Sequence, residues 1–262
     1  MDLHLTDKLA LVSGSTAGIG LAIASALAAE GARVIVNGRT EKRVDEALST
    51  IRAAHPHAKV GPFTGDLTKA ADAETLAHQF PDVEILVNNL GIFEPKAFEE
   101  ITDEEWLRFF DVNVVSCVRL SRLYLAGMRR RNWGRIVFIS SESAIQPPPE
   151  MLHYGTTKTA QIAIARGLAE LVAGTGITVN AVLPGPTRSE GVEAFVDKLS
   201  GGKPFDEFQT EFFEKARPTS LIKRFSTTEE IANLVTYVCS PRSSSTTGSA
   251  LRVEGGLLKS PF

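Results

Sequence analysis

A glycine-rich turn lies between a short apolar run and a helical pattern near the start of the chain. Residues 8–12 predict a buried strand, the turn SGSTAGIG follows at residues 13–20, and residues 21–30 predict a helix. In this order, the three parts aim backbone N–H groups at a phosphate, and the helix dipole adds attraction. Glycines also end strands for purely structural reasons, but this context predicts a nucleotide cradle. The residues expected to form it are Gly14, Ser15, Thr16, Gly18, Ile19 and Gly20.

Predicted strands and helices alternate along the rest of the chain. Further strands are predicted at residues 32–37, 59–63, 83–87, 135–139, 177–182 and 250–253. Further helices are predicted at residues 40–54, from about 69, from 102 toward 131, at 152–172 and at 228–238. Such alternation predicts a doubly wound α/β fold, in which helices cover both faces of one parallel sheet. We expect a single dinucleotide-binding domain over residues 1–262, since 43% apolar residues can supply a sizeable core.

The composition argues against several kinds of partner and site. A net charge of −3 shows no bias toward nucleic acid or an acidic membrane, and no apolar run approaches the length of a membrane span. Cys117 and Cys239 fall in apolar helical patterns, so we expect free thiols in a reducing cytoplasm. His55 and His57 have no Cys or acidic partner at ligand spacing, so they predict surface residues and no metal site.

The residues after the second predicted strand bear on the choice of dinucleotide. Gly38 and Arg39 stand where an NAD-specific protein would place an acid against the ribose 2′-hydroxyl. Arg39, with Lys42 and Arg43, suits a 2′-phosphate instead, although the three charges also fit a solvated first turn of the next helix. We therefore predict NADP, with NAD as the alternative. Asp66 ends the third strand, where it could accept from an adenine amino group or cap the next helix.

Tyr154 and Lys158 lie four residues apart in a predicted helix, so their side chains share one face. Bringing the pKa of a tyrosine from about 10 to neutrality requires about 4 kcal/mol, which Lys158 and a bound cationic nicotinamide could supply. Ser141 follows the predicted strand 135–139, at the end where open α/β sheets bind their ligands. A hydroxyl, an acidified phenol and a cation suit proton transfer to a carbonyl oxygen. Taken alone, Tyr154 and Lys158 would also fit a simple surface pair.

Three asparagines lie in apolar surroundings. Asn88 and Asn89 follow the fourth predicted strand, where their side chains can bridge neighbouring strands, and Gly91 lets the backbone approach a cofactor. Asn113 lies within the long helix predicted from residue 102. A buried asparagine needs hydrogen-bond partners. Asn113 therefore either caps a helical irregularity and holds a water, or is a satisfied core amide.

Residues 190–225 lack strand character and are rich in aromatic side chains. The aromatic residues are Phe195, Phe205, Phe208, Phe212 and Phe213. A long segment of this kind usually covers something, so we expect a mobile substrate lid with an apolar underside. Packing against a partner subunit would leave the same pattern. Such a lid favours a substrate with apolar surface, such as an acyl chain, a ring ketone or a quinone-like molecule.

In order and spacing, these motifs resemble those of the short-chain dehydrogenase/reductase family, from about residue 5 to residue 256. The matching residues are Ser13, Gly14, Gly18, Gly20, Asn88 to Gly91, Asn113, Ser141, Tyr154, Lys158, Pro184 and Gly185. Each motif is weak alone, but their joint spacing is highly specific. Ser13 stands in place of the family's common Thr, and Leu90 in place of the usual Ala of its Asn-Asn-Ala-Gly motif.

The resemblance implies a role for each matched residue. Tyr154 would be the general acid/base, Lys158 would depress the pKa of Tyr154 and hold the nicotinamide ribose, and Ser141 would position the substrate oxygen. Asn113 would hold the water that relays protons. The implied cofactor contacts are Gly14, Gly18 and Gly20 at the pyrophosphate, Asp66 and Leu67 at the adenine, Asn89 at the adenosine ribose, Thr187 and Ser189 at the carboxamide and phosphates, and also Gly91, Pro184 and Gly185.

The expected function is reversible hydride transfer between NADP(H) and a carbonyl or secondary alcohol, in a homotetramer or homodimer as the resemblance implies. An NAD-dependent alcohol dehydrogenase is an alternative, which Arg39 argues against. A nucleotide-binding sensor or scaffold without turnover would have little need of all four catalytic residues. An epimerase could use the same Tyr154 and Lys158, but the length and the glycine pattern fit the shorter reductases better.

Overall fold

In the computed structural model, which describes residues 1–199 and 204–261, the described strands form one parallel sheet. The strands are β1 (Leu9–Val12), β2 (Arg33–Gly38), β3 (Lys59–Thr64), β4 (Ile85–Asn88), β5 (Gly134–Ile139), β6 (Ile177–Pro184) and β7 (Ala250–Val253). Their order is β3-β2-β1-β4-β5-β6-β7, and every neighbouring pair is parallel. The chain therefore turns back at β1, and the carboxyl ends of β1 and β4 lie side by side at the switch point where such sheets bind ligands.

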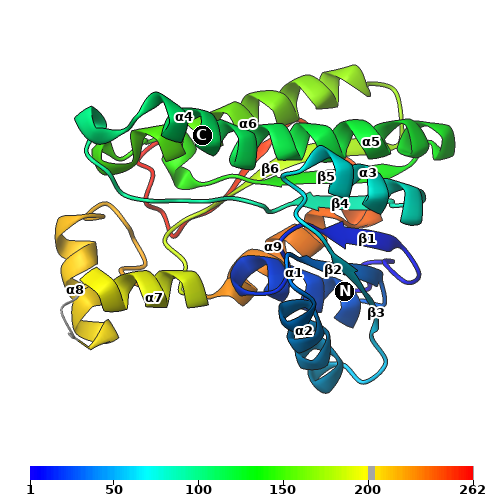
Figure 1. Cartoon of the computed structure of the whole chain (residues 1–262), viewed down its shortest axis with the longest axis horizontal. Helices are drawn as coiled ribbons and strands as arrows, with labels where there is room; N and C mark the ends of the chain where they lie inside the picture. The colour runs from blue at the N-terminus through cyan, green and yellow to red at the C-terminus, as the bar shows by residue number, and fades with distance from the viewer. Residues whose placement is uncertain (200–203, 262) are drawn as a thin grey trace.

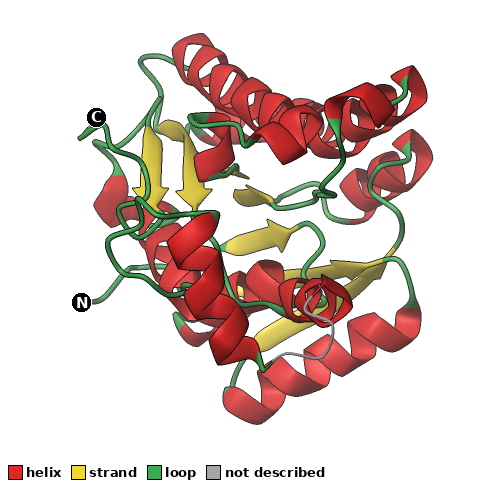
Figure 2. Ribbon diagram, turned by 90° about the vertical axis from the view of Figure 1, so that its left-hand side faces the viewer, coloured by secondary structure: helices red, strands yellow, loops and turns green. Residues whose placement is uncertain are grey.

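Helices cover both faces of this sheet (Figure 1; Figure 2). The α-helices are α1 (Gly18–Ala29), α2 (Glu41–Ala54), α3 (Ala70–Gln79), α4 (Asp103–Phe110), α5 (Ser116–Arg131), α6 (Leu152–Leu171), α7 (Glu190–Leu199), α8 (Phe205–Lys215) and α9 (Thr228–Val238). Short 3-10 turns are Phe98–Glu100, Glu142–Ala144, Pro149–Met151 and Pro241–Ser243. α1, α2 and α9 lie on one face, α3 to α6 on the other, and α7 and α8 to the side.

Two apolar clusters hold the layers together. Strand side chains alternate between the faces, so Val12 packs with α1, α2 and α9, whereas Leu11 packs with α3, α5 and α6. The strands read as continuous apolar runs because both faces are covered. The predicted doubly wound α/β fold is confirmed, and the predicted strands differ from the observed ones by at most two residues at either end.

The helix predicted from residue 102 toward 131 is interrupted. Thr102 caps α4 through a reciprocal hydrogen-bonding pair with Glu105, as the spacing predicts. A π-helical turn, Asp111–Val115, then separates α4 from α5 and carries Asn113. Such turns are frequent at functional sites. The segment 190–225, for which no helix was predicted, contains α7 and α8.

The cysteines, histidines and helices of the described part can be compared with what the composition predicts. Cys117 and Cys239 are buried free thiols. His57 is exposed, and the ring of half-buried His55 lies 3.1 Å from the Ser25 hydroxyl. Within residues 1–199 and 204–261, no helix is long and apolar enough to cross a membrane. The same residues contain no group of three or more His, Cys, Asp or Glu that could hold a metal ion.

Candidate active site

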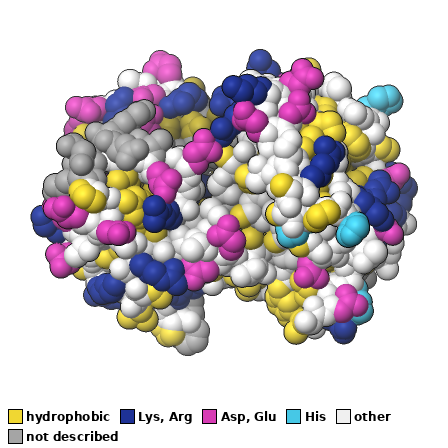
Figure 3. All heavy atoms as spheres, turned by 90° about the horizontal axis from the view of Figure 1, so that it is seen from below, with side chains coloured by type: hydrophobic (Ala, Val, Ile, Leu, Met, Phe, Trp, Pro, Cys, Tyr) yellow, Lys and Arg dark blue, Asp and Glu magenta, His cyan; other side chains and the backbone are white. Residues whose placement is uncertain are grey.

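A cavity of about 660 Å³ opens at the carboxyl ends of the central strands. Its lining residues come from the turn after β1, the ends of β4, β5 and β6, the first turns of α6, and the segment 189–225. Seen from below, the surface of the molecule intersperses Lys and Arg with Asp and Glu (Figure 3). Because its lining residues come from all of these segments, the cavity brings the predicted motifs together.

Ser141, Tyr154 and Lys158 line this cavity together. Ser141 follows the end of β5, whereas Tyr154 and Lys158 lie one turn apart on α6. The Lys158 ammonium nitrogen lies 5.6 Å from the centre of the Tyr154 ring, and it donates to the backbone oxygen of Ile139 at 2.9 Å. Lys158 is only 4% exposed, so this backbone contact fixes a charged group that has little access to water.

Burial shifts the pKa values of both α6 residues. It lowers the pKa of Lys158 from 10.5 to about 8. Burial also raises the pKa of Tyr154, and the negative charge of Glu142 raises it further, while the Ser141 hydroxyl offsets part of the rise. Burial is the largest cause, so the net shift of the Tyr154 pKa is upward, and a depression of this pKa by Lys158 and a bound cationic nicotinamide stays a prediction.

The glycine-rich turn is held by a network of side chains. The Ser13 hydroxyl accepts from the backbone N–H of Asn89 at 2.9 Å, and the Asn89 amide donates to the backbone oxygens of Ser13 and Gly14 at 3.0 and 3.1 Å. A Cβ at Gly20 would lie 2.4 Å from the oxygen of Gly14, so the turn requires glycine there. The usual hydroxyl role at residue 13 is thus kept by Ser13, and Asn89 braces the turn.

The first turn of α1 borders the cavity and has no side-chain cap. Its N-cap, Ala17, offers no side-chain hydrogen bond, and no acidic residue lies in the first turn. Gly18 has a φ of +54°, and a Cβ there would lie 3.3 Å from Cβ of Ser189. Ala17, Gly18 and Ile19 line the cavity with Ser189 opposite. The exposed N–H groups and helix dipole suit a phosphate.

Other predicted cofactor residues are placed differently. The Ser15 hydroxyl is buried and donates to the Val12 oxygen at 2.8 Å, and Leu67 is a core residue, so only their backbones can face a ligand. Asp66 accepts from the Thr68 hydroxyl at 2.7 Å. Burial raises the pKa of Asp66, but hydrogen bonds from Thr68 outweigh burial and leave that pKa lowered. Outside the cavity lining lie Gly14, Ser15, Thr16, Arg39, Asp66 and Leu67.

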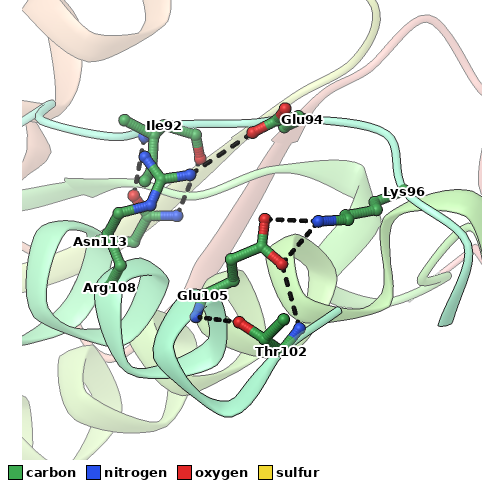
Figure 4. A network of polar contacts seen from close by, with 7 residues as sticks. All are labelled: Ile92, Glu94, Lys96, Thr102, Glu105, Arg108 and Asn113. Carbon is green, nitrogen blue, oxygen red and sulfur yellow. Dashed lines mark hydrogen bonds and ion pairs between the residues drawn. The ribbon is translucent and has the colours of Figure 1, made fainter. Parts of the chain in front are cut away.

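Asn113 is a fully bonded, buried amide. Its side chain accepts from the N–H of Ile92 at 2.8 Å and donates to the Ile92 oxygen at 3.0 Å (Figure 4). It also donates to the Thr157 hydroxyl at 3.0 Å. Its backbone oxygen accepts from the Gln161 amide at 2.6 Å and from the Cys117 thiol at 3.3 Å. Asn113 thus has the partners of a satisfied core amide and also lies in a helical irregularity, so both predicted alternatives stand.

Gln161 is a site residue that the sequence reasoning missed. It is fully buried, and its side-chain oxygen accepts from Lys158 at 3.3 Å while its amide nitrogen reaches Asn113. Gln161 therefore links Asn113, which is predicted to hold the proton-relay water, to Lys158, which is predicted to lower the pKa of Tyr154. A polar residue three positions after Lys158, on the same helix face, was the available signal.

The loop after β4 forms a fixed wall of the cavity. Besides the Asn113 contacts, Glu94 pairs with Arg108 at 3.4 Å and Lys96 pairs with Glu105 at 2.7 Å, which fastens the loop to α4 (Figure 4). The cavity residues that it supplies are Gly91, Ile92, Phe93 and Pro95. The larger Leu90 packs near Gly14 and the core instead of entering the cavity.

Comparison with known proteins identifies the family. A model of the short chain dehydrogenase family matches residues 8–200. The chain belongs to the short-chain dehydrogenase/reductase family. It is 49% identical to the oxidoreductase YvaG of Bacillus subtilis, over 100% of both chains. It is 34% identical to the D-beta-hydroxybutyrate dehydrogenase of Cupriavidus necator, over 96% of this chain and 98% of the relative.

A solved structure agrees with this assignment. L-sorbose reductase from Gluconobacter frateurii, complexed with NADPH and L-sorbose, has a TM-score of 0.92 at 31% identity, covering 99% of this chain and 100% of that one. The predicted family and fold are thus confirmed. The protein is a short-chain dehydrogenase/reductase, an oxidoreductase that acts on hydroxyl or carbonyl groups.

The segment after β6 forms another wall of the cavity. Pro184, Gly185, Thr187 and Ser189 all line the cavity, although the Thr187 hydroxyl is bonded to the Gly185 oxygen at 2.9 Å. Apolar side chains of the predicted lid follow them. These are Val192, Val196, Phe208, Phe212 and Phe225, and the last two rings stack 5.1 Å apart. Phe213 is buried and Phe205 packs on Phe225, whereas the Phe195 side chain lies outside the described part.

Two charged residues of the cavity were not singled out from the sequence. Glu142, directly after Ser141, accepts a hydrogen bond from the Ser141 hydroxyl. Arg217, shortly after α8, brings its Nε to within 3.7 Å of the other Glu142 carboxylate oxygen. Glu142 could have been noticed as an acid beside a predicted catalytic serine. Arg217 carried no local signal, because only the fold brings it there.

Proposed function

We propose that this protein transfers a hydride between NADP(H) and a carbonyl or secondary alcohol, with Tyr154 as the general acid/base. The observation that carries the proposal is that Ser141, Tyr154 and Lys158 line one cavity with the glycine-rich turn. A nucleotide-binding sensor without turnover would not need Ser141, Tyr154 and Lys158 in the same cavity as the glycine-rich turn.

The residues present fit a nicotinamide dinucleotide. The turn admits no Cβ at Gly20, the first residues of α1 line the cavity, and the same cavity reaches Tyr154. Gly18, Ile19 and Ser189 would hold the pyrophosphate, and Lys158 the nicotinamide ribose. When bound, the dinucleotide supplies or accepts the hydride, and the protein contributes orientation and the proton.

The chain's own residues handle the proton and the oxygen. In the reduction direction, Tyr154 gives its proton to the carbonyl oxygen as negative charge develops there, while Ser141 positions that oxygen. The Tyr154 phenol is protonated at neutral pH even at the ordinary tyrosine pKa of about 10, and this is the form that reduction needs. Tyr154→Phe should therefore abolish turnover and leave dinucleotide binding in place.

The preference for NADP rests on Arg39. Arg39 is exposed at the carboxyl end of β2, and within the described residues no hydrogen bond or ion pair engages its guanidinium. Arg43, by contrast, pairs with Glu190 at 3.0 Å. Two solved relatives, the L-sorbose reductase and an actinorhodin polyketide ketoreductase at 32% identity, were both solved with NADPH. An arginine that makes no ion pair with the described part of the chain suits a 2′-phosphate at this position.

Dinucleotide titration tests the proposal. NADPH and NADH are titrated separately against the wild type, Arg39→Ala and the matched control Arg43→Ala. NADPH should bind at least about tenfold tighter than NADH, a gap of about 1.4 kcal/mol. Arg39→Ala should lose most of that gap and Arg43→Ala should keep it. Equal binding of the two dinucleotides would overturn the NADP assignment and favour the NAD-dependent alternative, and binding of neither would overturn the enzymatic proposal.

We also propose a cytoplasmic homotetramer or homodimer in which α5 and α6 pair across an interface, and a lid formed by residues 190–225. Between α5 and α6 the surface has a groove whose lining includes Leu125, Ile164 and Leu168, and the neighbouring Leu171 is 58% exposed. Light scattering during size-exclusion chromatography tests the assembly, since a monomer at micromolar concentration would overturn it.

A further inference from the structure

Glu142 is a buried acid in direct contact with a proposed catalytic group. Its side chain is 6% exposed, and one carboxylate oxygen accepts from the Ser141 hydroxyl. That hydroxyl in turn accepts from the backbone N–H of Ser143 at 3.1 Å. The single proton of the Ser141 hydroxyl is therefore directed at Glu142 and away from the position of a substrate oxygen.

Arg217 holds the other side of the Glu142 carboxylate. Its Nε lies 3.7 Å from Glu142, and one terminal nitrogen lies 3.3 Å from Glu150. Its side chain is 14% exposed and lies over the Phe212 ring at 5.6 Å. Two carboxylates and one guanidinium leave one net negative charge in this corner. The walls beside it are apolar, with Ile92, Met151 and Phe212 among the lining residues.

We propose that Glu142, held by Arg217, forms a subsite for a hydroxyl group on the carbon next to the reacting carbonyl. The preferred substrates are neutral α-hydroxyketones, or the corresponding vicinal diols in the oxidation direction. This inference rests on the proposed function, because it places the reacting oxygen between Ser141 and Tyr154.

The placement of the hydroxyl follows from the shared contact at Ser141. An oxygen bound by Ser141 and Tyr154 lies one hydrogen bond from Ser141, and so does the Glu142 carboxylate. A substituent on the neighbouring carbon can therefore lie against Glu142. A hydroxyl there would donate to the carboxylate in a charge-assisted hydrogen bond and release the Ser141 proton for the carbonyl oxygen.

A methyl or carboxylate substituent beside Glu142 should bind less favourably than a hydroxyl. A methyl group cannot replace the hydrogen bond that Ser141 gives up, so the buried carboxylate loses a donor. A substrate carboxylate would place like charges together in a site with little water. The subsite thus discriminates between groups of similar size by hydrogen bonding and charge.

Three ketones that differ only at one carbon test the proposal. 1-Hydroxybutan-2-one carries CH₂OH, butan-2-one carries CH₃ and 2-oxobutanoate carries COO⁻ beside the same carbonyl. With saturating NADPH, kcat/KM for the hydroxyketone should exceed that of each other ketone by at least about tenfold. Binding of the same compounds to the NADPH complex of Tyr154→Phe, followed by quenching of NADPH fluorescence, should show the same order without turnover.

Two matched variants identify the group responsible. Glu142→Gln keeps the shape and removes the charge, so the preference over butan-2-one should fall severalfold and that over 2-oxobutanoate should fall furthest. Glu150→Gln removes the more exposed carboxylate, 49% exposed, on the same Arg217 and should keep the order of the three ketones.

The outcomes separate this inference from the proposed function. Equal reduction of the hydroxyketone and butan-2-one by the wild type would overturn the subsite and leave the proposed function standing. A uniform loss of kcat for all three ketones in Glu142→Gln, with ratios unchanged, would also overturn it, because Glu142 would then only orient Ser141. No reduction of any ketone by the NADPH-bound protein would overturn the proposed function, and the subsite with it.

Discussion

Lys158 should make the folded protein less stable at neutral pH, because its charge is buried. Its pKa falls from 10.5 to about 8 on folding. Below pH 8 both states bind the proton, so the full penalty is present. Between pH 8 and 10.5 the unfolded state still binds the proton and the folded state does not, so stability rises with pH. This difference in pKa corresponds to about 3 kcal/mol.

Lys158→Met removes the charge and keeps much of the side-chain volume. The variant gains about 3 kcal/mol from the lost penalty. It loses about 1 kcal/mol because the Ile139 oxygen no longer receives a hydrogen bond at 2.9 Å. The net expectation is an unfolding free energy about 2 kcal/mol above that of the wild type at pH 7. The difference should shrink above pH 8 and change sign near about pH 10.

Urea unfolding without dinucleotide, at pH 7, 8, 9 and 10, measures this difference. Lys42→Met serves as the control, because Lys42 is 85% exposed and its replacement should show no such trend. The variant should also lose turnover, which would make Lys158 a residue kept for function at the expense of stability. A difference that stays constant from pH 7 to 10, or a variant less stable than the wild type at pH 7, would refute the reasoning.

Two further changes test the positioning of the site. Gln161→Leu removes the acceptor for Lys158, so kcat should fall about tenfold while the Kd of NADPH stays constant. Gln161→Glu, which restores an acceptor, should recover part of the rate, and an unchanged kcat in Gln161→Leu would contradict the bridge. Gly20→Ala places a Cβ 2.4 Å from a backbone oxygen and should abolish dinucleotide binding measured by calorimetry. Gly167→Ala, with nothing within 4 Å, should bind normally, and tight binding by Gly20→Ala would contradict the cradle.

The sheet was predictable because its signals are local. Apart from the edge strands β3 and β7, each strand is a short and largely buried apolar run, so the run itself predicts the strand. The glycine-rich turn predicts the first βα unit, because the apolar run, the turn and the helical pattern follow one another directly in the sequence. The spacing of Tyr154 and Lys158 likewise follows from one helical turn. These inferences required no knowledge of contacts between distant parts of the chain.

The polar parts of the site were less predictable because they depend on long-range contacts. Arg217 reaches Glu142 only through the path of α8, and Gln161 reaches the Asn113 backbone oxygen only because a π-helical turn faces α6. The net direction of the pKa shift of Tyr154 in the free protein also depends on burial. Sequence spacing reveals the neighbouring cation of Lys158, but it does not reveal how strongly burial acts on the phenol.

The charge of Glu142 acts on Tyr154 in the same direction as burial, and this bears on the direction of catalysis. Glu142 and burial both hold the proton on Tyr154, while burial also weakens the ammonium that would draw it off. Tyr154 therefore carries its proton in the free protein, which is the form that ketone reduction requires, whereas oxidation requires the phenolate. We expect the oxidation direction to need a higher pH than reduction. The same Glu142 that holds the proton is the group proposed to select the hydroxyl, so removing its charge should change both pH dependence and substrate choice.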